Sequence, residues 1–107
     1  SDEEILFERV ANVMGTGVEW RVKDFMDYVT NLMHQGNSDC AELKNWIGTG
    51  DTRSAGRKLS AYAGRTRGPW KLIRHEGASR SMWYTVEPLN EEAKRFGDRN
   101  REPEFQM

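Results

Sequence analysis

The chain has 107 residues, enough for one domain, of which 36% are hydrophobic and 31% are charged. Its uncharged apolar stretches are only a few residues long. We therefore expect no transmembrane helix, no apolar core of a signal peptide and no membrane partner. Four Trp, four Phe and three Tyr are too many for a disordered chain.

Cysteine usage and the first residue suggest where the chain works and in what form. One cysteine, Cys40, cannot form an internal disulfide, so we expect a reducing, cytoplasmic setting. One Cys and two His cannot build an ordinary structural zinc site, so we expect no metal. Because the chain begins at Ser1, we expect either a removed initiator Met or a piece of a longer protein.

The charge is unevenly distributed, although the net charge is only −1. Between Thr52 and Met82 the chain has eight basic residues and one acidic residue, Glu76, a net of +7. The remaining eight basic and 16 acidic residues give −8. Such an asymmetry within a small domain predicts one surface that meets an anionic partner. The alternative is a solvated basic face that an acidic face balances.

Apolar residues at helical spacing predict two helices in the first third of the chain. The first covers residues 2–14 and ends at Gly15-Thr16-Gly17. Residues 18–22 alternate in polarity and form at most a short extended segment. The second helix begins at Val22 and ends near Gly36, since glycine is a common C-terminal stop.

Two further helices are predicted before residue 64. A short helix around Leu43–Ile47 is closed by Gly48-Thr49-Gly50. Asp51 or Thr52 then caps a helix that runs to about Ala63. The helical period gives this helix two faces. Its apolar face consists of Ala55, Leu59 and Tyr62, and its outward face of Arg53, Arg57, Ser60 and Gly64.

A β-hairpin is predicted after the break at residues 64–69. Trp70–His75 reads as the first strand, Glu76–Arg80 as a polar turn and Met82–Val86 as the returning strand. If Tyr84 and Val86 point inward, Trp83 points outward. A last short helix is expected over residues 90–96, and a charged, frayed tail from Gly97.

The order of these elements predicts a mainly α fold with a β-hairpin (α+β), a winged helix-turn-helix. We expect this domain over residues 1–88, followed by a short helix and a flexible tail over residues 89–107. In such a fold the last helix of the bundle enters the major groove of DNA and the hairpin forms the wing. The basic residues concentrate in these two elements, so duplex DNA is a more suitable partner than a single strand.

The candidate DNA-binding residues follow from this placement. Arginines on the helix can pair with guanine or clamp phosphates, and small residues allow a close approach. Basic residues at the helix exit, along the first strand and at the wing tip suit phosphate contacts. Lys58 lies nearer the apolar edge of its helix, where its stem can cover the core. The candidates are Arg53, Arg57, Lys58, Ser60, Arg65, Arg67, Lys71, Arg74 and Arg80.

Several short stretches resemble a known domain family. They are Ser54-Ala55-Gly56-Arg57-Lys58-Leu59, Gly64-Arg65, Gly68, Leu72 and Trp83-Tyr84-Thr85-Val86, together with Trp20–Phe25. They resemble the winged-helix domain at the C-terminal end of primase-helicase and replicative ATPase proteins of phages and plasmids. There, a small-Gly-Arg-x-Leu helix precedes Gly-Arg and a hairpin that ends in aromatic-x-Val.

The resemblance covers roughly Leu6 to Pro88. It implies a phage or mobile-element origin, a role in DNA replication, and the remainder of a larger replication protein as a partner. The chain departs from these proteins because it has no primase or ATPase part and no Walker-type loop. It would then be the accessory module alone.

No constellation of catalytic residues is found, so we expect a non-enzyme without a cofactor. His34, His75 and Cys40 have no partners at a suitable spacing. Trp20, Trp46 and Trp70 read as core residues, and Trp83 as a cover of the hairpin more than a base-stacking group. An alternative function is a winged-helix module that binds a protein, or a small phage-encoded regulator or inhibitor.

Overall fold

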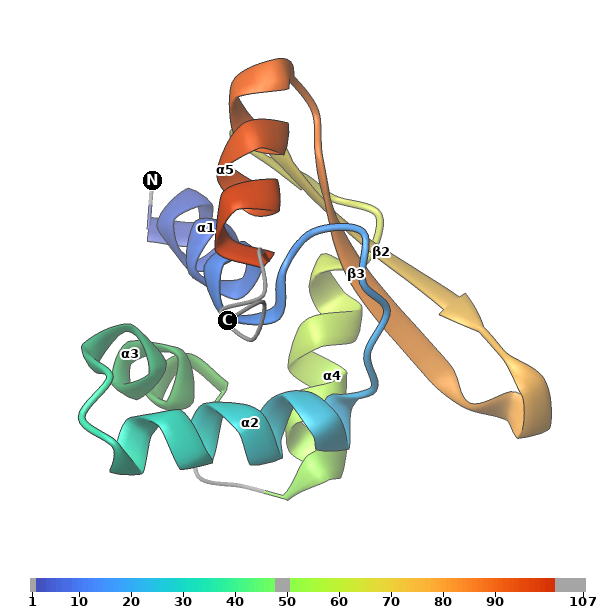
Figure 1. Ribbon diagram of the computed structural model, residues 1–107. Coiled ribbons are helices and arrows are strands. Elements are labelled where there is room, and N and C mark those ends of the chain that lie inside the picture. The colour runs from blue at the N-terminus through green and yellow to red at the C-terminus, as the bar shows by residue number, and fades with distance from the viewer. Residues whose placement is uncertain (1, 48–50, 102–107) are drawn as a thin grey trace.

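The computed structural model describes residues 2–47 and 51–101, and Figure 1 gives the path of the chain. Within these residues the fold is α+β, with five α-helices and a three-stranded antiparallel sheet. In chain order the elements are α1 Asp2–Met14, α2 Val22–His34, α3 Ser38–Ile47, α4 Thr52–Tyr62, β1 Thr66–Arg67, β2 Trp70–Glu76, the 3-10 turn Ala78–Arg80, β3 Met82–Pro88 and α5 Glu91–Arg101.

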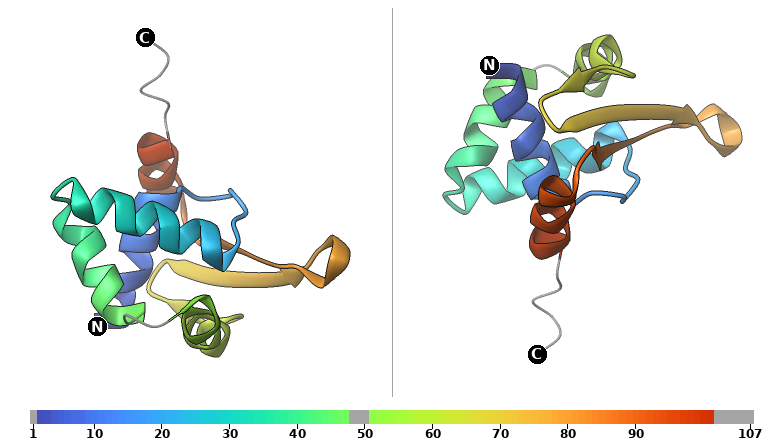
Figure 2. Two further views of the ribbon diagram at one scale, coloured as in Figure 1. Left: turned by 90° about the horizontal axis from the view of Figure 1, so that it is seen from below. Right: turned by 90° about the horizontal axis from the view of Figure 1, so that it is seen from above.

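The helices α2, α3 and α4 contact one another, and α1 packs against α3 and against all three strands (Figures 1 and 2). Each contributes an apolar stripe at helical spacing, as the sequence predicts. Phe7 and Val10 of α1, Phe25 of α2, Leu43 of α3 and Leu59 of α4 are at most 2% exposed. One core therefore holds all four helices.

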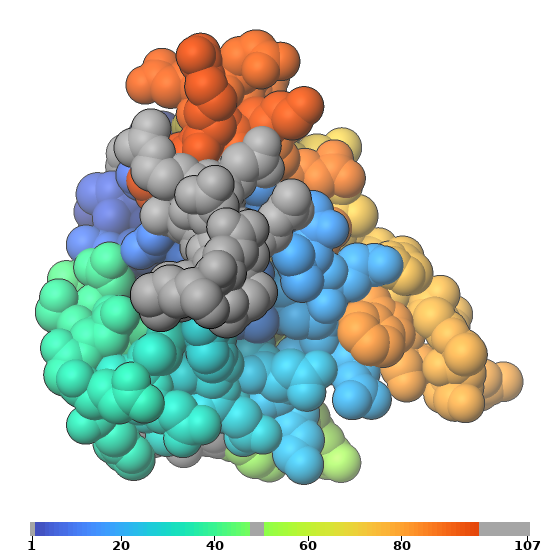
Figure 3. Space-filling view, viewed as in Figure 1, coloured from blue at the N-terminus to red at the C-terminus, as the bar shows by residue number. Residues whose placement is uncertain are grey.

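The sheet has the order β1-β2-β3, and its hairpin β2–β3 extends beyond the helices as an arm (Figures 2 and 3). Within the hairpin Leu72 pairs with Val86 and Arg74 with Tyr84. Trp20 adds a single bridge to Tyr84 on the free edge of β3. The expected extended segment before α2 is thus one bridging residue long.

Side chains alternate along the hairpin, because successive residues of a strand face opposite sides. Tyr84 and Val86 are 2% and 1% exposed and face the helices, while Trp83 is half-buried on the other face. The expected outward direction of Trp83 is confirmed. Leu72 and Trp70 of β2 are buried with Tyr84 and Val86, so the base of the hairpin belongs to the core.

The C-terminal helix differs from its prediction. We expected it to end near Phe96, but α5 continues through Gly97 to Arg101. Asn90 begins the helix by accepting a hydrogen bond from the backbone of Ala93 at 2.7 Å, and Phe96 packs edge-on against Trp70 at 5.8 Å. A glycine inside a helix costs only about 1 kcal/mol, so an anchored first turn carries the helix past it.

The segments that follow α3 and α4 also bear on the predicted elements. The short strand β1 was not predicted, since it lies in the expected break after α4. The predicted stop at Gly48-Thr49-Gly50 lies outside the described residues. Over the described part of the chain, no helix combines the length and the apolar character needed to cross a bilayer.

Candidate nucleic-acid interface

Helix α4 begins at a capped N-terminus, as its sequence predicts. The side chain of Asp51 accepts a hydrogen bond from the backbone N–H of Ser54 at 2.9 Å. This bond holds the pKa of Asp51 below its ordinary value. Ala55 and Leu59 are 1% and 0% exposed and press the helix against the core. The opposite face of α4 is therefore turned to solvent.

That outward face carries a row of arginines. Arg53 and Arg57 are exposed, and with Ser60 they follow the spacing i, i+4, i+7, which places all three on one stripe of the helix. At the end of the stripe, Nη1 of Arg74 donates a hydrogen bond to Oγ of Ser60 at 3.0 Å. The stripe therefore continues onto the hairpin. We call Arg53, Arg57 and Arg74 the basic row.

A shallow hollow lies beside the hairpin end of the basic row. It has a volume of about 360 Å³ and is lined by Ala63, Gly64, Lys71, Ile73 and Arg74. Two of these five residues, Lys71 and Arg74, are cationic, so the hollow suits an anion. We call it the basic hollow.

Arg65 lies next to the basic hollow. It is exposed, and its carbonyl accepts a hydrogen bond from the N–H of Leu72 on the neighbouring strand. Its positive charge helps to lower the pKa of Glu3, although less than the hydrogen bonds to that carboxylate do. Arg65 thus extends the positive surface beyond α4.

Arg80 lies at the far tip of the hairpin, away from α4 (Figure 2). Ser79 and Arg80 have left-handed backbones, with φ of 61° and 62°, which turns the chain between the strands. Arg80 is exposed. The tip is therefore a separate positive point at the end of an arm.

Four of the nine predicted residues have partners inside the protein: Arg74 and Ser60 bind each other, and Lys58 and Arg67 bind residues of other elements. Nζ of Lys58 donates to the carbonyl oxygen of Trp46 at 2.5 Å, in the last turn of α3. Nε of Arg67 contacts Oε1 of Glu3 at 2.6 Å. Lys58 and Arg67 are held by α3 and α1, whereas Arg74 binds Ser60 within the candidate interface, so we leave Lys58 and Arg67 out of it. Ser60, expected on the outward face, is half-buried and turned toward the hairpin.

The remaining predicted cations are not held by carboxylates at short range. Among the described residues, the ion pairs within 4 Å involve Arg9, Arg21, Arg67 and His75. Apart from Lys58, the predicted cations outside these pairs are Arg53, Arg57, Arg65, Lys71, Arg74 and Arg80. Their donors therefore face solvent or neutral groups, as an interface for an anion requires.

Trp83 lies on the other face of the hairpin from Tyr84. The guanidinium of Arg21 stacks over its ring at 5.2 Å from the centroid. Its indole also lies against the backbone at Gly77, where an added Cβ would come within 2.7 Å of the ring. These two contacts cover the ring, so Trp83 is a packing residue of the hairpin. The sequence alone gave no signal for the contact with Arg21.

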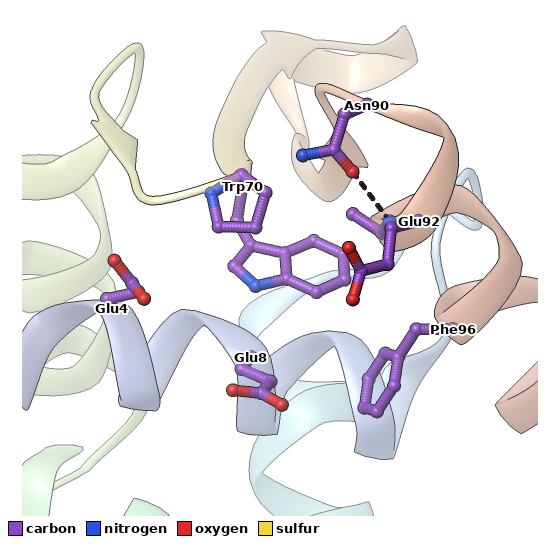
Figure 4. Close-up of a pocket in the computed structure, with 8 residues that line it drawn as sticks. Glu4, Glu8, Trp70, Asn90, Glu92 and Phe96 are labelled. Carbon is purple, nitrogen blue, oxygen red and sulfur yellow. Dashed lines mark hydrogen bonds between the residues drawn. The ribbon is translucent and has the colours of Figure 1, made fainter.

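A second hollow has the opposite charge. It has a volume of about 210 Å³ and lies between α1 and α5. Figure 4 shows the indole of Trp70 between Glu4 and Glu8 of α1 and Glu92 and Phe96 of α5. We call it the acidic hollow. Its carboxylates repel phosphate, so it is no part of a nucleic-acid interface.

Comparisons with known proteins add no relative. No protein-family model, no curated protein and no solved structure matches this chain. The basic row and the two hollows therefore carry the inference of a function.

Proposed function

We propose that this chain is a winged-helix module that binds duplex DNA, with α4 in the major groove and the β2–β3 hairpin as the wing. The order of elements supports this fold: α1, the bridging residue Trp20, α2, α3, α4 and then the hairpin. The observation that carries the proposal is the basic row, which runs from α4 onto the hairpin and, among the described residues, makes no ion pair within 4 Å.

The chemistry of the basic row suits this partner. A major groove about 12 Å wide admits one helix, and arginine can pair bidentately with guanine or clamp a phosphate. Arg53 and Arg57 would enter the groove, while Arg74, Lys71 and Arg65 would meet the backbone beside it. Arg80 at the tip of the hairpin would reach a neighbouring stretch of backbone.

The biological setting is a further part of the proposal. The resemblance of residues 54–59 and 83–86 to the accessory domain of phage and plasmid replication proteins supports a role in DNA replication inside the cell. The chain would supply binding and no catalytic step, and a larger replication protein would supply the chemistry. No cofactor is needed for this role.

Fluorescence anisotropy with a labelled duplex tests the proposal. The double variant R53A/R57A should weaken duplex binding at least tenfold at low salt, because two phosphate or base contacts are lost. The slope of log affinity against log salt should become shallower by about 0.9 for each phosphate contact removed. A single-stranded probe of the same length tells whether the duplex is preferred.

The matched control is K94A/R95A, which removes two exposed cations from α5. Figure 1 shows α5 at the opposite end of the molecule from α4. This variant should change the duplex affinity by no more than about twofold at low salt, because its charges act only through the long-range field, and it should keep the salt slope. Equal effects of the two double variants would mean that only total charge matters, and unchanged binding of R53A/R57A would exclude α4 as the interface.

A second candidate function is protein binding, which the acidic hollow favours. Its aromatic floor and its carboxylates suit a Lys or Arg side chain of a basic partner. A labelled oligo-lysine peptide provides the test. Binding that E8Q/E92Q weakens, together with no duplex binding at low salt, would support this function over the first.

A further inference from the structure

A chain of hydrogen bonds runs from the core of the molecule to the basic row. The hydroxyl of Tyr84 lies 2.9 Å from Oγ of Ser60, and Nη1 of Arg74 donates to the same Oγ at 3.0 Å. Tyr84 is 2% exposed, Ser60 is half-buried and Arg74 is exposed. A buried phenol is thus connected to a surface guanidinium through one serine.

The Tyr84 end of this chain is fixed by its surroundings. Its ring stacks on Trp20 with centroids 5.6 Å apart and planes 20° apart. Its backbone N–H donates to the carbonyl of Trp20 at 2.8 Å and its carbonyl accepts from the N–H of Trp20 at 2.9 Å. Contacts on both the ring and the backbone leave the hydroxyl a single position. At that position the hydroxyl lies 2.9 Å from Oγ of Ser60 on α4.

The Arg74 end is open to a ligand. A guanidinium has five N–H donors, and the bond to Ser60 uses one of them. No ion pair within 4 Å holds Arg74 among the described residues. Beside it lies the basic hollow, to which Lys71 contributes a second positive charge.

The strand edge adds a backbone donor to the same place. Leu72 exchanges hydrogen bonds with Gly64 and Arg65 on this edge of β2. Backbone groups of alternate residues point to the same edge, so the N–H of Arg74 also points there, one step beyond Gly64. The basic hollow therefore combines a guanidinium, an ammonium and an open strand edge.

We propose that Tyr84 and Ser60 are positioning residues that hold the Arg74 guanidinium as a preformed seat for one phosphate group. This inference rests on the proposed DNA-binding function, because that phosphate would belong to the nucleic-acid backbone. A free arginine side chain loses rotamer freedom when it binds, whereas an anchored one has already lost much of it. Removing the anchor should weaken binding without removing any charge.

The duplex titration separates a positioning residue from a contact residue. R74A should lower both the affinity and the salt slope, the slope by about 0.9, because a charge–phosphate contact is lost. Y84F and S60A keep every charge, so each should weaken binding about threefold to tenfold with an unchanged slope. In the R74A background, Y84F should have no further effect on duplex affinity.

A second measurement does not need DNA. In the free protein, nuclear magnetic resonance of the Arg74 Nε–H should show an ordered side chain, which becomes mobile in Y84F and in S60A. Titration with inorganic phosphate should shift this signal less in the variants. S60A covers the case in which Y84F fails to fold, and the K94A/R95A variant should leave the signal unchanged.

The outcomes distinguish the two proposals. The wild-type chain could fail to bind duplex at low salt while its Arg74 signal is ordered and responds to phosphate. That result would exclude the DNA-binding function but support the phosphate site at Arg74. If duplex binds and Y84F and S60A bind as tightly as the wild type, the positioning role is wrong. An Arg74 side chain equally mobile in wild type and S60A would overturn it as well.

Discussion

Glu3 connects the first helix to residues about 60 positions later in the chain. Its carboxylate accepts a hydrogen bond from the hydroxyl of Tyr62 at 2.6 Å and another from Nε of Arg67 at 2.6 Å. The guanidinium of Arg67 also lies over the ring of Tyr62, 5.7 Å from its centroid. The hydrogen bond from Tyr62 lowers the pKa of Glu3 most, and the bond from Arg67 is the second cause. The same bond to Glu3 raises the pKa of Tyr62.

The lowered pKa of Glu3 leads to a prediction about acid stability. A carboxylate with a depressed folded-state pKa stabilises the fold above its ordinary value of about 4.3, and this contribution is lost as the pH falls through the folded-state pKa. E3Q should therefore lower the melting temperature more at pH 7 than at pH 3. Thermal unfolding at both pH values measures the difference. E8Q, at an exposed position on the same helix, is the control. An equal loss at the two pH values would contradict the role of the charge.

At the scale of elements, much of the fold follows from periodicity in the sequence. The apolar stripes of α1 and α2 predict their bounds, and the alternation of Tyr84 and Val86 predicts the face on which Trp83 lies. The sequence narrows the cap of α4 to Asp51 or Thr52, and in the structure Asp51 is the capping residue. These patterns involve residues that are close together in the sequence, so they can be recognised without knowing the fold.

The contacts that shape the candidate interface join residues that are distant in sequence. The bond between Ser60 and Tyr84 spans 24 residues, and the pair of Glu3 and Arg67 spans 64. A charge pattern marks Arg67 as basic but does not reveal the carboxylate that the fold brings to it. The sequence therefore predicts the basic surface as a whole, and the packing of the elements decides which cations remain available.

Gly56 provides a prediction for α4. It lies inside the helix, where an added Cβ would meet Val22 only at an ordinary contact distance of 3.9 Å. G56A should stabilise the protein by about 0.5–1 kcal/mol, because alanine loses less backbone freedom in a helix. Gly64, with φ of +80° and no neighbour within 4 Å, is the matched control. G64A should destabilise through the backbone alone. Denaturant unfolding measures both, and a loss of stability in G56A would show that α4 packs more tightly on α2.

At the scale of the whole molecule, the two hollows have opposite charge and lie on different elements. The basic row and the basic hollow lie on α4 and the hairpin, whereas Glu4, Glu8 and Glu92 surround the acidic hollow at α1 and α5. The described fold measures about 30 Å in each direction. Such a separation orients the molecule toward a polyanion at low salt, since its field extends about 30 Å at 0.01 M but only about 8 Å at 0.15 M.

This distance dependence predicts how charges at the far end act on association. Glu91 and Glu92 are exposed in the first turn of α5. E91Q/E92Q should raise the rate of association with a duplex roughly twofold at 0.01 M salt, because two repelling charges lie within the range of the field. At 0.15 M salt the same variant should associate at the wild-type rate.

Stopped-flow mixing with a labelled duplex at both salt concentrations measures these rates, and circular dichroism checks that α5 stays folded in the variant. R53A/R57A should slow association at both concentrations, since its charges would lie at the contact itself. If E91Q/E92Q instead accelerates association equally at 0.01 M and 0.15 M, the carboxylates of α5 act at short range. In that case the duplex approaches the molecule from the side of the acidic hollow, and α4 is not the surface that meets it first.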